Sequence, residues 1–175
     1  APIDGSKLAT LNGTTTATHE VVVDIQACHG SGSRFLHVGE DTEHSLSLEA
    51  RSTGHLYMSV ADISVSVVHA HTQGRVVLHG VAYTAHADPY ERVRVYANGS
   101  RLVELNHPDV PQGWPIDFAL GKYLVIGNRE VGDRTPIGEI YYAAAYDRAL
   151  TPEQVLQNAQ LLLLDDDTPS GEAPR

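Results

Sequence analysis

Residues 138–158, GEIYYAAAYDRALTPEQVLQN, join a strand-like segment to a capped helix, and this junction constrains the fold more than any other part of the chain. Apolar residues occupy both alternating positions of segment 140–146, which is typical of a strand in the middle of a two-layer sandwich. Further on, Thr151 is suited to an N-cap, Pro152 to the first helical position and Gln154 to the third position of a capping box. A strand followed by one short C-terminal helix is therefore predicted.

This helix also has a recognisable apolar face. Val155, Ala159 and Leu162 lie at positions i, i+4 and i+7 of the predicted helix. Because residues at this spacing share one side of a helix, we expect the three side chains to pack on the sandwich.

Short strand-like segments with turn signals between them recur along the whole chain. Asn98–Gly99 is the strongest hairpin signal, and in segment 92–96 the valines and arginines alternate as in a half-buried hairpin. This pattern predicts an all-β fold, a jelly-roll β-sandwich of two antiparallel sheets with one short C-terminal helix. The predicted strands are 8–11, 19–27, 34–38, 45–50, 55–60, 64–69, 75–84, 92–96, 101–105, 123–126 and 140–146.

Three segments carry a family resemblance. Segment 138–158 resembles the closing strand and helix of bacterial LamG-like modules, which belong to the concanavalin A-like lectin/glucanase superfamily and include pentraxin-like jelly rolls. Segment 92–103, RVRVYANGSRLV, resembles the hairpin V-x-x-Y-x-N-G of that family, and segment 123–127, YLVIG, resembles its following strand. The resemblance covers about residues 17–160. It implies a non-catalytic binding or adhesion module of an extracellular protein, with a glycan or a protein as ligand.

Length and charge limit the classes of function. The 175 residues, of which 42% are hydrophobic, predict one domain over residues 1–164. The acidic segment 165–175 is predicted to be a disordered tail. A net charge of −10 and the lack of a basic cluster argue against a nucleic-acid partner, and no apolar run is long enough to span a membrane.

The single cysteine, Cys28, excludes an intramolecular disulfide bond. It is followed by His29, but Ile25 stands where a haem-attachment motif needs its first cysteine, so no haem is expected. The chain begins with Ala1, as a protein does after signal cleavage or an excised segment does, and together with the resemblance this predicts a secreted or cell-surface location.

The enzymatic alternative is a glycoside hydrolase or lyase. Retaining glucanases of the superfamily use alternate carboxylates on one strand, and the chain contains no E-x-D-x-E segment. The nearest acids, at 40–43, have turn-like surroundings and the wrong spacing. We therefore predict that the protein is not an enzyme.

The long segment 106–122 contains three prolines and the only tryptophan, so it is the first candidate for a ligand-binding loop. Trp114 with Tyr90 and Tyr123 could form a platform for stacking sugars; the alternative is that Trp114 packs into the core. The predicted ligand-binding residues are Trp114, Tyr90, His107 and Asp109.

Calcium is the most plausible metal, because loop carboxylates supply the oxygen ligands that it prefers. The predicted ligands are Asp88, Asp109 and Asp133, and the alternative role of each is to form an Asx turn. A weaker hypothesis places a transition metal at His69 and His71, with His79 and His86 brought near by strand pairing.

A different class of function is a structural subunit that assembles with copies of itself. Polar and apolar residues alternate in segments 64–69 and 92–96, and either strand could meet the sheet edge of a neighbour. This homo-oligomeric alternative stands beside the binding module.

Overall fold

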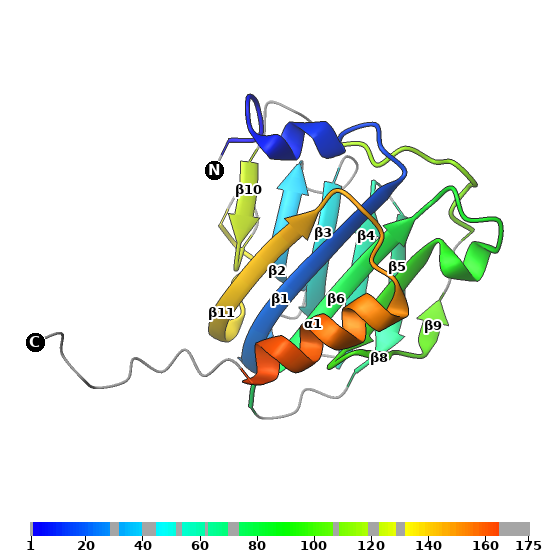
Figure 1. Cartoon of the computed structure of the whole chain (residues 1–175). Helices are drawn as coiled ribbons and strands as arrows, with labels where there is room; N and C mark the ends of the chain where they lie inside the picture. The colour runs from blue at the N-terminus through cyan, green and yellow to red at the C-terminus, as the bar shows by residue number, and fades with distance from the viewer. Residues whose placement is uncertain are drawn as a thin grey trace, which may run out of the picture.

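The computed structural model shows two antiparallel β-sheets packed face to face, with one α-helix lying across the outer face of one sheet (Figure 1). This architecture confirms the predicted jelly-roll sandwich. The structure describes residues 2–28, 32–39, 45–51, 54–61, 63–69, 74–106, 109–118, 123–128 and 132–164. The predicted tail, 165–175, lies outside these residues.

The sheet that carries the helix has five strands in the order β11-β1-β6-β7-β8. The strands are β1 (Thr16–Ala27), β6 (Val76–Tyr83), β7 (Val93–Ala97), β8 (Ser100–Arg101) and β11 (Ile137–Tyr146). Asn98 and Gly99 both have positive φ angles, 48° and 81°, and connect β7 to β8 as the predicted hairpin turn.

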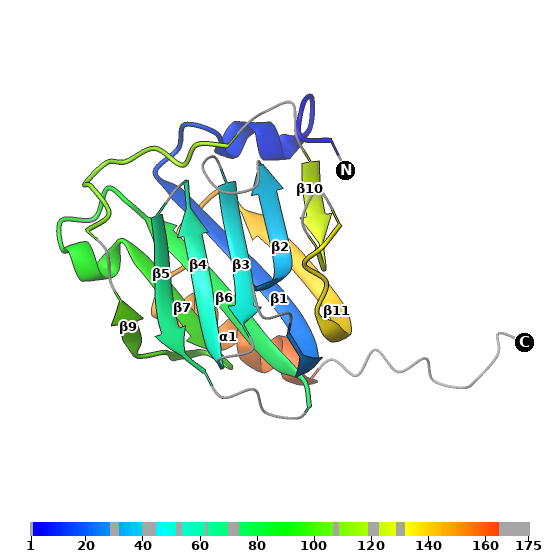
Figure 2. The same cartoon turned by 180° about the vertical axis from the view of Figure 1, so that it is seen from behind.

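The second sheet, seen in front in Figure 2, has six strands in the order β10-β2-β3-β4-β5-β9. Its strands are β2 (Ser33–Gly39), β3 (Ser45–Arg51), β4 (His55–Val60), β5 (Ile63–Val68), β9 (Glu104–Asn106) and β10 (Tyr123–Ile126). Alternate apolar side chains of both sheets, such as Leu48 on β3, Met58 on β4 and Val21 on β1, fill the space between them.

The helix α1 (Pro152–Leu164) begins as predicted. The backbone N–H of Gln154 donates to Oγ1 of Thr151 (3.3 Å), and the N–H of Thr151 donates to Oε1 of Gln154 (3.0 Å). Val155 and Ala159 are fully buried and Leu162 is partly buried against the sheet, so the predicted packing face is confirmed. None of the described helices has the length and apolarity that crossing a membrane requires.

The predicted first strand, 8–11, is wrong, because these residues belong to the 3₁₀ helix η1 (Lys7–Leu11). Ser6 caps this helix by accepting a hydrogen bond from the N–H of Leu8 (3.2 Å), and Thr10 donates to the carbonyl of Lys7 (2.6 Å). Local side-chain bonds to the backbone thus outweigh the strand-like composition.

The predicted strand 101–105 is divided between the two sheets. β8 pairs with β7 in one sheet, whereas β9 pairs with β5 in the other. The chain crosses between the sheets at Leu102 and Val103, where the N–H of Leu102 donates to Val95 and the carbonyl of Val103 accepts from Val68.

Two expectations about strand position are also corrected. β11 pairs only with β1 and is an edge strand rather than a central one. The 92–96 segment is buried on both faces rather than half-buried, because α1 and the segment that leads into it cover its outer face. β5 and β7 have paired strands on both sides, so neither is the free edge that was predicted for self-assembly.

Candidate binding groove

The groove lies at one end of the outer face of β6. Strand alternation places Val77, His79, Val81 and Tyr83 on this face, under and beyond α1. The helix packs on the first part of the row, where Ala159 meets Val77 and Val155 meets Val81. Tyr83 lies beyond the start of the helix and is 37% exposed.

A groove of about 400 Å³ opens at this uncovered end of the sheet. Its walls come from the start of β1, the end of β6, the start of β7, the turn after β6 and the segment that leads into α1. The lining residues are Thr16, Tyr83, His86, Arg94, Arg148, Ala149, Leu150, Thr151 and Pro152.

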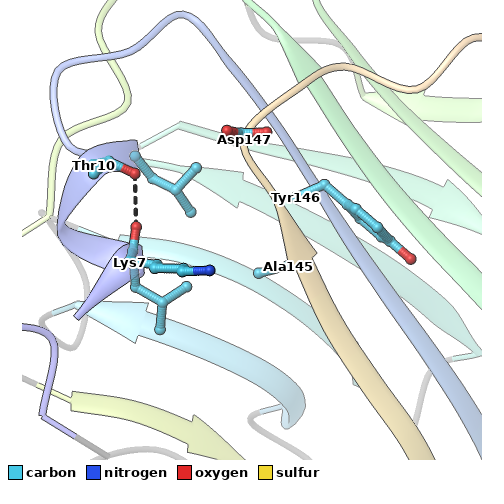
Figure 3. Close-up of a pocket in the computed structure, with 7 residues that line it drawn as sticks. Lys7, Thr10, Ala145, Tyr146 and Asp147 are labelled. Atoms are coloured by element: carbon cyan, nitrogen blue, oxygen red, sulfur yellow. Dashed lines mark hydrogen bonds between the residues drawn. The ribbon is translucent and has the colours of Figure 1, made fainter.

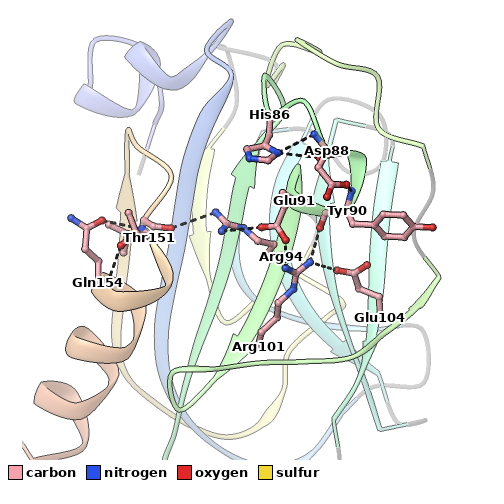
Figure 4. Close-up of polar contacts among 10 residues, drawn as sticks. His86, Asp88, Tyr90, Glu91, Arg94, Arg101, Glu104, Thr151 and Gln154 are labelled. Carbon is pink, nitrogen blue, oxygen red and sulfur yellow. Dashed lines mark hydrogen bonds and ion pairs between the residues drawn. The ribbon is translucent and has the colours of Figure 1, made fainter.

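Tyr83 is held in place by His86. The two ring centroids are 5.4 Å apart and the ring planes make an angle of 70°, an edge-to-face contact. The backbone N–H of Asp88 donates to Nδ1 of His86 (3.1 Å), which fixes the orientation of the imidazole (Figure 4). The aromatic surface in the groove is therefore preformed.

The buried guanidinium of Arg92 ties the loops beside the groove to each other. It donates to the carbonyls of His86 (2.9 Å), Ala87 (3.1 Å) and Val110 (2.6 Å). Since hydrogen bonds from a charged donor are stronger than neutral ones, this residue links the turn after β6 to the segment at 109–116.

Arg94 lies between the sheet and the segment that leads into α1, and it is 7% exposed (Figure 4). Its Nη1 contacts Glu91 at 3.4 Å and its Nη2 contacts the carbonyl of Leu150 at 3.5 Å, both long for hydrogen bonds to a charged group. Its Nε has no hydrogen-bond partner in the described part of the chain. Burial raises the pKa of the neighbouring Tyr96, although the charge of Arg94 opposes this effect, so the phenol is neutral near pH 7.

The remaining charges at this end form a network that reaches Arg94 through Glu91. Arg101 pairs with Glu91 and also with Glu104 (3.0 Å), and it donates to the carbonyl of Tyr90 (2.6 Å), as Figure 4 shows. These bonds hold the 3₁₀ helix η2 (Pro89–Glu91) against β8 and β9. The network positions the loop and does not line the groove.

A second, smaller pocket of about 280 Å³ lies between η1 and the end of β11 (Figure 3). Lys7 and Asp147 give it one charge of each sign, and the remaining lining residues are Leu8, Thr10, Leu11, Ala145 and Tyr146. Because the hydroxyl of Thr10 donates to the carbonyl of Lys7, its hydrogen is not available to a ligand. The first groove offers more volume.

The aromatic residues predicted from the sequence do not form one platform. Tyr90 is 60% exposed on η2, while Tyr123 lies on β10, at the far edge of the six-stranded sheet from β9. Trp114 is partly buried and packs against the core, and its carbonyl accepts a hydrogen bond from Thr84 (2.5 Å). The alternative role of Trp114, core packing, agrees with this position.

The predicted calcium ligands are also apart from one another. Asp88 accepts a hydrogen bond from the N–H of Tyr90 (3.0 Å) as the N-cap of η2, and Asp109 lies 3.6 Å from Arg92. Asp133 is exposed in the segment between β10 and β11. Within the described ranges, no group of three or more His, Cys, Asp or Glu residues could hold a metal ion. The calcium prediction gains no support from these carboxylates.

The histidines serve other contacts. His79 pairs with Glu20 beneath α1, whereas His86 packs on Tyr83 at the groove. His71, His107 and the acids at 40–43 lie outside the described residues.

Of the residues that line the groove only His86 was among the predicted site residues, so the central ones, Tyr83, Arg94 and Arg148, were missed. The alternation of 92–96 already directs Arg94 to the outer face, away from the core valines. Tyr83 and Arg148 lie beside Arg94 because of where α1 begins. The docking of the helix brings together residues that are far apart in the sequence. Only the packing of the helix on the sheet reveals this arrangement.

No protein-family model matches the chain, and no curated protein is significantly similar to it in sequence. Solved structures do share its fold. A carbohydrate-binding module, CBM40 of the Ruminococcus gnavus IT-sialidase bound to α2,3-sialyllactose, has a TM-score of 0.66 and 14% identity over 90% of this chain and 89% of that one. The native heptameric SAP-like pentraxin from Limulus polyphemus has a TM-score of 0.60 and 21% identity, over 85% of this chain and 71% of that one.

The Trypanosoma rangeli sialidase is a third neighbour, with a TM-score of 0.60 and 15% identity; the match covers 85% of this chain but 23% of the sialidase. At these identities the likeness defines the fold alone, a jelly-roll β-sandwich. Membership of the LamG-like family stays a prediction.

Proposed function

We propose that the protein is a non-catalytic, extracellular glycan-binding module and that the sugar binds in the groove around Tyr83. The observation that carries this proposal is a partly exposed tyrosine ring, held by His86, in a groove of about 400 Å³. The apolar face of a sugar can pack on such a ring, while hydroxyl and guanidinium groups at the walls can bind sugar hydroxyls. The groove volume lies in the usual range for small-ligand sites.

The contents of the groove favour binding over catalysis. Glycoside hydrolysis needs two carboxyl groups at a defined separation. Among the described residues that line the groove there is no carboxylate, and the smaller pocket has one, Asp147. The groove thus offers contacts for a sugar but no acid and base.

The comparisons add a consistent precedent. CBM40, which the chain resembles over most of the length of both, is a carbohydrate-binding module. Because one fold supports many functions, the proposal rests on the groove and not on this likeness.

A glycan array followed by calorimetry on the strongest ligand tests the proposal. Tyr83→Ala should weaken binding roughly tenfold or more, since it removes the aromatic face, and 1.4 kcal/mol corresponds to tenfold. Tyr90→Ala is the matched control, because Tyr90 is a more exposed tyrosine at the same end of the molecule but outside the groove. The control should bind like the unaltered protein.

Two results would contradict the proposal. An array with no binding above background would remove the glycan-binding function. Loss of affinity in Tyr90→Ala with none in Tyr83→Ala would move the site from the groove to the surface around η2, where the sequence-based prediction placed it.

One observation supports self-assembly as a second candidate. β11 is the longest edge strand among the described residues, with ten residues and a single charged side chain, Glu139. Long edge strands with few charges are prone to pair with another strand. Light scattering across micromolar concentrations should show a dimer or larger species, and Tyr142→Lys should abolish it; a monomer throughout would exclude this candidate.

A further inference from the structure

The charges lining the two pockets differ. Two arginines, Arg94 and Arg148, line the groove with His86, and the described lining residues include no acid. This is notable in a chain with a net charge of −10. In the smaller pocket Lys7 and Asp147 offset each other. Glu91, outside the lining, pairs with Arg94 at 3.4 Å, so the positive charge of the groove without a partner among the described residues is that of Arg148.

From this we infer that the groove selects an acidic sugar and that Arg148 binds its carboxylate. The inference rests on the proposed glycan-binding function and specifies the class of ligand. A guanidinium presents paired N–H donors in one plane, which match the two oxygens of a carboxylate.

Arg148 has a fixed backbone and a free side chain. The hydroxyl of Thr18 donates to the carbonyl of Arg148 (2.8 Å) and accepts from the N–H of Leu150 (3.1 Å), and the hydroxyl of Thr16 donates to the carbonyl of Asp147 (3.1 Å). The segment is therefore bound to β1 on both sides of the arginine. The guanidinium is exposed and has no ion pair or hydrogen bond to any residue that the structure describes. It can pair with a ligand without breaking an internal contact.

Arg94 supplies a second, buried cation with unused donor capacity. Its two contacts, to Glu91 and to Leu150, are 3.4 and 3.5 Å long, and Nε has no partner among the described residues. A guanidinium has five N–H donors, so an acceptor in the groove can be added to the existing contacts. Two arginines from different elements, β7 and the segment before α1, thus contribute to one binding surface.

The test compares acidic sugars with the same sugars after the charge is removed. Calorimetry is done on the unaltered protein with oligosaccharides ending in a sialic or uronic acid, with their carboxyl methyl esters and with the neutral core sugars. We expect the free acids to bind at least tenfold more tightly than the esters. Raising the salt concentration should reduce this ratio, because the groove is open to solvent.

Arg148→Gln should bring the acid-to-ester ratio to within about threefold, because it removes the charge that favours the free acid. Lys7→Gln removes the same charge at the smaller pocket and should leave the ratio as it is. Arg148→Lys, which keeps the charge but lacks the planar fork, should give an intermediate ratio.

Equal affinity for acids, esters and neutral sugars would overturn the acidic selectivity and leave the glycan-binding function standing. Preference for sulfated sugars with no preference for carboxylates would overturn the assignment of a carboxylate. Absence of binding to every glycan would remove both the selectivity and the function on which it rests.

Discussion

Two charged clusters lie on the same outer face of the five-stranded sheet, one beneath α1 and one just beyond its start. Beneath the helix, Glu20 is 1% exposed and accepts hydrogen bonds from His79 Nε2 (2.6 Å), Tyr146 Oη (2.7 Å) and Asn158 Nδ2 (2.8 Å). Beyond the helix, Arg94 has two long contacts and Arg148 has none within the described residues. The carboxylate of the first cluster is held by three donors, although Nδ1 of His79 has no partner among the described residues, whereas the guanidinium donors of the second cluster are largely unused.

This difference separates a structural charge from one available to a ligand. Burial raises the pKa of Glu20, but the hydrogen bonds from His79, Tyr146 and Asn158 lower it by more, so the carboxylate stays ionised. Such a group has no capacity left for a ligand. The arginines at the groove retain donors, and an added acceptor would complete their hydrogen bonding.

Glu20→Ala gives the largest expected effect. It leaves three buried donors under α1 without their acceptor, and since each such donor costs about 1 to 3 kcal/mol, a loss of at least about 3 kcal/mol is expected. Urea denaturation should show a loss of this size in the free energy of unfolding. Glu139→Ala, at an exposed carboxylate on β11, is the control and should cost less than about 1 kcal/mol.

A loss below about 1 kcal/mol for Glu20→Ala would contradict the structural role of the cluster. Glu20→Gln adds a second measurement, because the amide keeps the shape and one carbonyl acceptor. The loss of unfolding free energy for Glu20→Gln should lie between the losses for Glu20→Ala and Glu139→Ala.

The Glu20 cluster also shows what could not be predicted from the sequence. Tyr146 and Asn158 are 126 and 138 positions away from Glu20 in the chain. No local pattern connects them, and contact requires the pairing of β1 with β11 and the docking of α1. The capping box of Thr151 and Gln154 was predictable because both partners lie within one helical turn.

The position of β11 in its sheet could not be predicted from the sequence either. The apolar residues on both faces of β11 indicated a central strand, yet β11 is an edge strand. Apolar residues on two faces show that both faces pack, and they do not show how many neighbouring strands a strand has. The groove was missed for a related reason. Tyr83 is exposed only because α1 does not extend over it, and this depends on where the helix packs on the sheet.

The two faces of β1 should contribute differently to the pH dependence of stability. His19, next to Glu20 in sequence but buried in the core, has no hydrogen-bond partner for either nitrogen among the described residues. Burial, with a smaller contribution from the charge of His37, lowers its pKa to about 3. The unfolded chain binds this proton near pH 6.5 and the folded protein does not, so the stability from His19 is complete above pH 6.5 and is lost as the pH falls towards 3.

His19→Leu should therefore reduce the acid sensitivity between pH 6 and 5. One proton changes the slope of the unfolding free energy by about 1.4 kcal/mol per pH unit. Denaturant titrations at both pH values measure it, and Glu20 contributes equally to the two proteins, because its hydrogen bonds lower its pKa in both. An unchanged slope would show that the folded protein binds the proton at His19.

A smaller effect is expected at the boundary between the two clusters, where Thr151 caps α1. Thr151→Ala removes the side-chain acceptor of the Gln154 N–H and should destabilise the protein by about 1 kcal/mol. Gln157→Ala, at an exposed position on the same helix, is the control and should have almost no effect. Equal stability of the two variants would mean that the capping box does not hold the helix start.

The smallest effect is expected for Arg148→Gln. Because its guanidinium has no partner within the described part of the chain and is exposed, its replacement should change the free energy of unfolding by no more than about 0.5 kcal/mol. A loss as large as that of Thr151→Ala would show that the arginine stabilises the fold, and the contrast with Glu20 would fail. Unchanged stability together with a lost preference for acidic sugars would assign the charge of Arg148 to the ligand, as its free donors lead us to expect.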